Sequence, residues 1–258
     1  MIEINRLYKS FDNSNFVLNN VNLTVKAGET KVIIGRSGVG KSVLLKTIVG
    51  LLRPDSGTIK VNGTEVTTLS EKDYNKLRME IGYVFQGGAL FDSMTVAENV
   101  GFVLNEFMKL DKKTIKDKVG DCLAMVGLQG IEEMIPSQLS GGMKKRVSLA
   151  RVLCMEPQII LYDEPTSEVD PITADAINNL IIEMRDKLKV TSIVVTHDMN
   201  SAYKVADTIA MLYHGQVIAE GSPDEIRHTK HPVVKQFIYG EAHGPITEDE
   251  SLIFGHVK

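Results

Sequence analysis

The eight residues from Gly35 to Ser42 have the types and the spacing needed to hold the phosphates of a nucleotide. Two glycines with four residues between them are followed by a lysine and a serine, in the order Gly35-Arg36-Ser37-Gly38-Val39-Gly40-Lys41-Ser42. Glycines let the backbone turn tightly and bring its N–H groups up to phosphate oxygens. The Lys41 ammonium can reach the β- and γ-phosphates, and the Ser42 hydroxyl can ligate Mg²⁺. The pattern predicts a nucleotide-binding loop.

The segments on either side of this loop agree with that prediction. Residues 30–34 are typical of a buried strand, and apolar residues recur at helical spacing from Leu44 to Leu52. The loop then ends on a helix N-terminus, whose dipole favours phosphate. A chance glycine turn would give the pattern in a chain of this length with a probability of about one per cent, so nucleotide binding is the better interpretation.

Three polar groups follow other strand-like runs. Asp163 and Glu164 come after four apolar residues, and Gln86 and His197 also follow buried strands. An acid at a strand end can hold Mg²⁺, and a second carboxylate can deprotonate an attacking water. Alone, each group could be a solvated loop side chain. Since a parallel sheet gathers its strand-end residues at one crevice, we expect all of them beside the phosphate loop.

A second anion site is predicted at residues 139–143, where a serine and two glycines open a helix. The stretch reads Leu139-Ser140-Gly141-Gly142-Met143. A single nucleotide needs only one phosphate-binding helix end, so the second requires an explanation.

The elements that position these groups are those of an α/β protein. Loose alternation up to residue 27 predicts two or three antiparallel strands, and buried strands recur near residues 81–85, 158–162, 191–196 and 208–219. Between residues 87 and 155 the pattern is helical and charged, which predicts a helical lobe inserted into the core. The polar stretch from residue 240 to residue 258 is typical of an extended tail.

Composition narrows the class of protein. The chain has 258 residues, 43% of them apolar and 24% charged, and a net charge of −4, which does not favour nucleic acid as a partner. No apolar run approaches the roughly 18 residues of a membrane span, and the N-terminus is not typical of a signal peptide. We expect a cytosolic protein in which Cys122 and Cys154 are reduced core residues.

Together these motifs resemble the ATP-binding-cassette (ABC) ATPase family over residues 1 to about 240. The resemblance implies a P-loop NTPase of mixed parallel-sheet core, with an antiparallel β subdomain and an inserted α-helical subdomain. Its core would span about residues 1–86 and 156–240, its helical subdomain about 87–155, and a C-terminal extension 241–258.

The resemblance also implies the roles of single residues. Glu164 would be the catalytic glutamate, assisted by the switch histidine His197, by Lys41 and by the Q-loop residue Gln86. Mg²⁺ would be held by Ser42, Gln86 and the Walker B residue Asp163. ATP would contact residues 35–42, Val43, Ser140, Gly141 and Gly142 of the signature motif, Asp170 of the D-loop, and Phe11. On spacing alone Phe11 is better explained as a core or turn aromatic, and the resemblance makes it the residue that stacks on adenine.

Two copies in this family dimerise head to tail, so that the signature motif of one closes over the ATP of the other. That arrangement would explain the second anion site. Met143 stands where the family usually has Gln, which leaves the contacts from Ser140 and the glycines intact. The resemblance further implies separate transmembrane permease subunits and a peripheral location on the cytoplasmic face of the inner membrane. Residues 87–108 would dock a permease helix.

A finer resemblance points to the ATPases of Mla and MCE-type phospholipid transporters. It rests on residues 35–46, with Val43 in place of the commoner Ser or Thr, and on residues 84–100, 139–146 and 240–245. It implies lipid cargo, an MCE-domain lipid-binding subunit and a small STAS-type subunit. The alternatives are an ABC ATPase for another substrate, a non-transport ABC ATPase, or a nucleotide-binding regulator. The apolar residues Leu252, Ile253 and Phe254 predict that the tail docks on a neighbouring subunit.

Overall fold

A six-stranded sheet forms the centre of the protein in the computed structural model, which describes residues 1–12, 15–108 and 110–248. The strand order is β10-β9-β3-β8-β7-β6, and all neighbours are parallel except β9 and β10. Its strands are β3 (Thr30–Ile34), β6 (Ile81–Val84), β7 (Ile159–Asp163), β8 (Thr191–Thr196), β9 (Thr208–Tyr213) and β10 (Gln216–Gly221). Every residue of β3, β7 and β8 is buried, as expected for strands covered on both faces.

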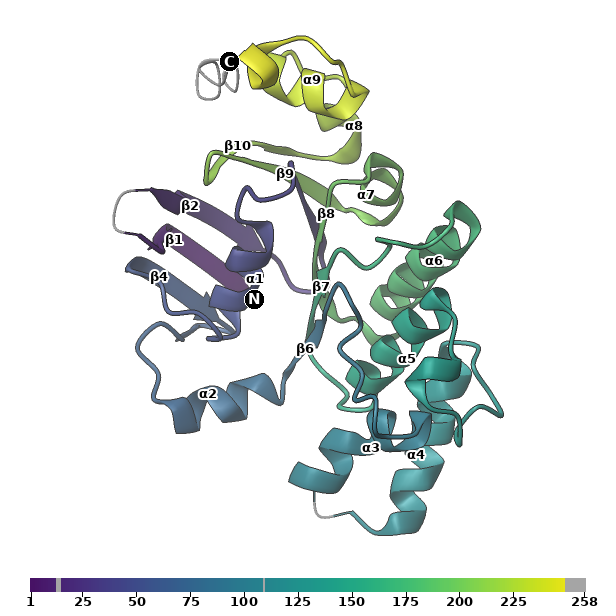
Figure 1. Ribbon diagram of the computed structural model, residues 1–258. Coiled ribbons are helices and arrows are strands. Elements are labelled where there is room, and N and C mark those ends of the chain that lie inside the picture. Colours follow the sequence, from purple (N-terminus) through teal and green to yellow (C-terminus); the bar gives the residue numbers. More distant parts are fainter. Residues whose placement is uncertain (13–14, 109, 249–258) are drawn as a thin grey trace.

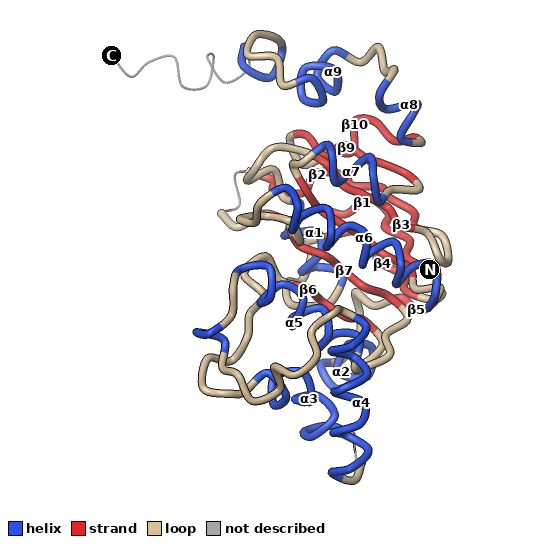
Figure 2. The backbone as a smooth tube through the Cα atoms, turned by 90° about the vertical axis from the view of Figure 1, so that its right-hand side faces the viewer, coloured by secondary structure: helices blue, strands red, loops and turns tan. Residues whose placement is uncertain are grey.

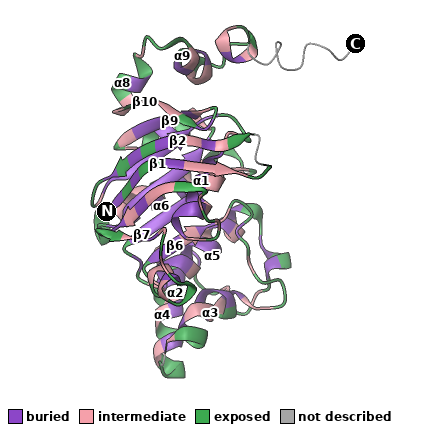
Figure 3. Ribbon diagram, turned by 90° about the vertical axis from the view of Figure 1, so that its left-hand side faces the viewer, coloured by how far each residue is buried: buried purple, intermediate pink, exposed green. Residues whose placement is uncertain are grey.

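A second, antiparallel sheet packs against one face of the first with a helix between them (Figure 1). Its order is β2-β1-β4-β5, with β1 (Ile2–Ser10), β2 (Phe16–Val25), β4 (Ser56–Val61) and β5 (Thr64–Glu65). The helix α1 (Lys41–Ile48) buries Leu44, Leu45 and Ile48 in the core that joins the two sheets. The short helix α2 (Glu71–Arg78) follows, capped by Ser70. Figure 3 shows the buried faces of both sheets.

Helices lie on the other side of the central sheet. They are α3 (Val96–Phe107), α4 (Lys112–Met125), the 3-10 turn η1 (Pro136–Gln138), α5 (Gly141–Leu153), α6 (Pro171–Leu188) and α7 (Met199–Val205). Of these, α5 contacts β6 and α7 contacts β3 and β8, whereas α3 and α4 pack on α5 and project away from the sheet (Figure 1). Alternate residues of each strand divide between the two cores: Val194 of β8 packs under these helices, whereas Ile193 and Val195 face α1. In Figure 2, α3 and α4 lie at the opposite end of the molecule from α8 (Pro223–Arg227) and α9 (Pro232–Tyr239). The α/β fold class is confirmed.

The tail differs from the extended segment expected from composition. Residues 245–248 form a helical turn, and Ile246 is 5% exposed in the core beside α9. The buried Gln236 holds this turn, because its Oε1 accepts from the Ile246 N–H at 2.7 Å and its Nε2 donates to the Glu241 carbonyl at 3.2 Å. The prediction of an extended tail is therefore wrong for residues 245–248. The proposed docking residues 252–254 lie outside the described residues.

Among the residues that the structure describes, no helix is both long and apolar enough to cross a membrane.

Candidate active site

The predicted phosphate loop joins the end of β3 to the start of α1, as the sequence indicated. Two of its glycines are required by close backbone approaches. A Cβ at Gly35 would lie 2.4 Å from the Leu212 carbonyl oxygen, and one at Gly40 would lie 2.7 Å from that of Val17. Gly40 also has a φ of 104°, which other residues rarely adopt. Any side chain at either position would displace the loop from β9 or β2.

Lys41 is buried inside this loop, at 5% exposure. Its Nζ donates to the carbonyls of Gly35 at 2.8 Å and Arg36 at 3.0 Å, and lies 3.5 Å from Glu164 Oε1. Burial lowers the pKa of Lys41, and the neighbouring Glu164 charge works against that shift. The ammonium is thus held at the loop with an acid at its side.

Asp163 lies at the end of β7, which β8 separates from β3 in the sheet, and its carboxylate contacts the phosphate loop. Its Oδ1 accepts from the Ser42 hydroxyl at 2.6 Å, and its Oδ2 accepts from the Tyr83 hydroxyl at 2.9 Å. Burial and the Asp163 charge raise the pKa of Tyr83, so its hydroxyl stays a donor. The Ser42 hydroxyl and the Asp163 carboxylate are oxygen donors side by side. This donor set fits Mg²⁺, which takes few protein ligands and completes its shell with water and phosphate.

Glu164 connects the loop lysine to a histidine. Its Oε1 lies 3.5 Å from Lys41 Nζ, and its Oε2 lies 3.0 Å from Nδ1 of His197, which follows β8. Glu164 is 8% exposed, whereas the His197 side chain is 56% exposed. The φ of Glu164 is 50°, in the left-handed region that costs a non-glycine residue energy. A buried carboxylate is therefore held rigidly between a cation and a ring that faces solvent.

The signature residues lie apart from this cluster, at the start of α5. Ser140 and Gly141 are exposed, and the Ser140 hydroxyl accepts from the Met143 N–H at 3.2 Å. Gly142 is buried against Thr173 of α6. Asp170 caps α6 by accepting from the backbone N–H groups of Ile172 and Thr173 at 3.0 Å. The first residues of the signature motif at the start of α5 are therefore accessible from outside the chain.

The remaining predicted residues are more open. Phe11 follows β1 with 62% exposure, and Lys9 Nζ lies 5.6 Å from its ring centroid. The Gln86 side chain is exposed beyond β6, while Val43 packs partly against the core around α1. Their predicted roles stay predictions.

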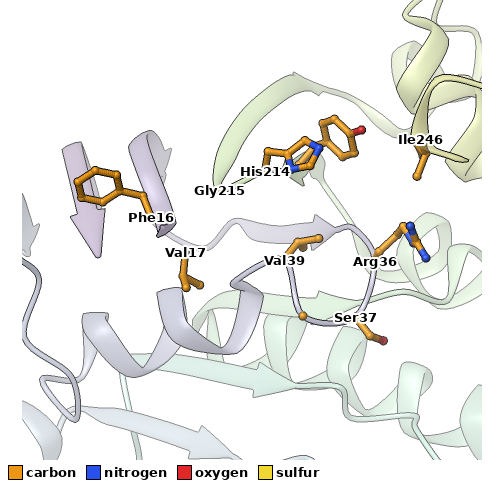
Figure 4. Close-up of a pocket in the computed structure, with 10 residues that line it drawn as sticks. Phe16, Val17, Arg36, Ser37, Val39, His214, Gly215 and Ile246 are labelled. Atoms are coloured by element: carbon orange, nitrogen blue, oxygen red, sulfur yellow. The ribbon is translucent and has the colours of Figure 1, made fainter. Parts of the chain in front are cut away.

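A hollow of 350 Å³ borders the phosphate loop (Figure 4). Arg36 and Ser37 of the loop line it together with Phe16 and Val17 of β2, His214 and Ile246. Figure 4 shows Phe16 at one end and Arg36 with Ile246 at the other. Sequence reasoning missed the residues outside the loop, because no motif marks them and Ile246 reaches the hollow only through the folded tail.

Comparison with known proteins agrees with this geometry. The family model described as "ABC transporter" matches residues 18–167. The "Probable ribonucleotide transport ATP-binding protein mkl" of Mycobacterium tuberculosis is 42% identical over 96% of this chain and 69% of its own length. The "Intermembrane phospholipid transport system ATP-binding protein MlaF" of Haemophilus influenzae is 38% identical over 89% of this chain and 87% of its own.

A solved structure titled as a dimeric, post-hydrolysis state of the ATP-binding cassette MJ0796 bound to ADP and Pi has the same fold. Its TM-score is 0.80 at 32% identity, covering 86% of this chain and 99% of that one.

Proposed function

This chain belongs to the ABC transporter family and is an ATP-hydrolysing cassette, and we propose that it powers the movement of phospholipid or a related lipid between membranes. The observation that carries the catalytic part is the buried contact of Glu164 with Lys41 on one side and His197 on the other. A carboxylate between a phosphate lysine and a histidine can orient and deprotonate the attacking water.

The roles within the site follow from the contacts. Glu164 acts as the base, His197 orients its carboxylate, and Lys41 stabilises charge on the transferred phosphoryl group. Ser42 and Asp163 would hold Mg²⁺, assisted by the Gln86 side chain, and the ion would neutralise charge on the phosphate oxygens. Phe11 is proposed to stack on adenine, and its exposure leaves the ring face available to a base.

The exposed start of α5 supports a head-to-tail dimer. Ser140 and Gly141 are exposed, and the γ-phosphate bound to a second copy could meet the backbone N–H groups of this helix N-terminus. Asp170, at the start of α6, would lie near the same interface. We propose that each ATP is held between the phosphate loop of one copy and the signature residues of the other.

A groove of 370 Å³ beside the Gln86 loop is proposed to dock the permease. It is lined by aromatic and long side chains, among them Phe85, Phe91, Phe102, Arg151 and Met155. Phe91 is 42% exposed and packs on Phe102 at 4.8 Å between ring centroids. Changing Phe91 to Asp should release the chain from its permease without unfolding it, as judged by co-purification and circular dichroism.

The two relatives differ in the cargo that their names give. MlaF is named for phospholipid transport and mkl for ribonucleotide transport. Val43 and the segment 240–245 favour the Mla and MCE-type assignment. We propose permease, MCE-domain and STAS-type partners, and a location on the cytoplasmic face of the inner membrane.

Two measurements test the proposal separately. Glu164→Gln keeps the shape of the side chain but removes the base, so it should bind ATP and turn it over about 10²–10⁴-fold more slowly. Near-normal turnover in the assembled complex would contradict the catalytic role. Mass spectrometry of the complex extracted from membranes should find bound phospholipid. A complex that carries no lipid would contradict the cargo assignment and leave the ATPase assignment in place.

A further inference from the structure

Lys145 is a buried cation that no motif explained. It lies in α5, two residues after Met143 of the signature motif, and is 8% exposed. Its Nζ donates to the backbone carbonyl of Gln86, to the Ser167 hydroxyl at 3.2 Å and to the backbone carbonyl of Glu164 at 3.5 Å. The three acceptors come from the loop after β6, the end of β7 and the loop before α6. One side chain therefore joins three segments of the site to the helix that carries the signature.

The chemistry of lysine suits this position. A buried ammonium is costly unless its donors are satisfied, and the three donors of Lys145 have three acceptors. Burial lowers the pKa of Lys145, whereas the charges of Glu168, Glu164 and Asp163 act in the opposite direction. An uncharged side chain could fill the same space, so packing alone does not call for a lysine here.

The acceptor on Glu164 matters because that residue has an unusual backbone. Its φ is 50°, and its carbonyl oxygen accepts from Ser167 Oγ at 2.9 Å and from the Ser167 N–H at 3.1 Å as well as from Lys145. A strained conformation persists only where its surroundings hold it. The hydrogen bond from Lys145 is therefore one of the contacts that hold the backbone of Glu164 in this conformation.

We propose that Lys145 is a positioning residue, which fixes the backbone of Glu164 relative to the Gln86 loop and so links movement of α5 to the alignment of the catalytic carboxylate. This inference rests on the proposed catalytic role of Glu164. The alternative is that Lys145 only stabilises the fold, in which case its loss would lower stability without a specific effect on turnover.

The experiment compares three variants of the full-length chain in its membrane complex. Lys145→Met should lower kcat about 10²-fold, as expected for a misplaced catalytic group, while the Kd for ATP changes less than about twofold. Lys145→Arg keeps the charge and should recover part of the lost kcat. Lys116→Met makes the same chemical change at an exposed position of α4 and should retain kcat. If kcat of Lys145→Met stays within about twofold of the wild type, the inference is wrong.

A double variant separates positioning from a general structural effect. Because Lys145 acts through the Glu164 carboxylate, Lys145→Met should slow single-turnover hydrolysis by less than about twofold when Glu164 is already Gln. A further loss as large as in the wild-type background would overturn the inference. If Lys145→Met does not fold, Lys145→Gln replaces it with the same expectations and the same overturning results. Normal turnover by Glu164→Gln alone would instead contradict the proposed function.

Discussion

The two regions predicted to bind phosphate are built in opposite ways. Around Asp163 and Glu164 the side chains are buried and contact one another, with separations from 2.6 to 3.5 Å. At the start of α5, Ser140 and Gly141 are exposed, and within the described residues the Ser140 hydroxyl accepts a hydrogen bond from Met143 of its own helix. In the first region the charged and polar side chains hold one another in place. The second is exposed to solvent, as expected for a surface completed by another molecule.

This contrast has a physical basis. Buried charges are costly unless they are paired, and the region around Glu164 finds its partners within one chain. Backbone N–H groups at a helix N-terminus can remain solvated until an anion arrives. The following predictions test the contrast, from the largest expected effect to the smallest.

Lys41→Met should have the largest effect. It removes the cation that lies between the loop carbonyls and Glu164, and turnover should fall about 10²–10³-fold. Steady-state ATPase assays measure the change. Lys46→Met, on the same helix, is the matched control and should keep its activity. Equal losses in both variants would show that the buried position of Lys41 is not what matters.

A mixed dimer should show partial activity. If one copy carries Lys41→Ala and the other Ser140→Arg, both lesions fall in one composite site and the second site is intact, while each homodimer is inactive. The measurement is ATP turnover by a tandem-purified heterodimer. An inactive heterodimer would mean that the signature residues serve the ATP of their own chain, and the comparison between the two regions would fail.

Tyr83→Phe should weaken the buried region moderately. It removes the donor to Asp163 Oδ2 and leaves a buried carboxylate oxygen short of a partner, so the free energy of unfolding should fall by about 1–3 kcal/mol. Urea denaturation followed by circular dichroism measures it. An unchanged midpoint would indicate that solvent replaces the hydroxyl.

Ser140→Ala should have the smallest effect on the isolated chain. It removes only the N-cap of α5, and the free energy of unfolding should fall by about 1 kcal/mol. Ser70→Ala, which removes the cap of the polar helix α2, is the matched control for stability. Only the Ser140 variant should also lower ATP turnover in the complex, and a loss in both would argue against a specific role for the signature serine.

Much of the fold follows from local pattern. Short segments with three consecutive apolar residues, at 32–34 and 193–195, lie in central parallel strands, and the spacing from Gly35 to Ser42 identifies the phosphate loop. These features depend on residues that are neighbours in the chain, since periodicity selects the element and burial selects its face. The types of Asp163, Glu164 and His197 and their places at strand ends were predictable in the same way.

The partners of those residues depended on the tertiary structure. Tyr83 reaches Asp163 across 80 residues because β6 and β7 are neighbours in the sheet, and Lys145 reaches the Gln86 carbonyl across 59 residues. Gln236 holds the helical turn in the tail by accepting a hydrogen bond from the Ile246 N–H, a contact that composition could not indicate. Such contacts are decided by strand order, register and helix docking, which bring together residues whose separation in the chain carries no periodic signal.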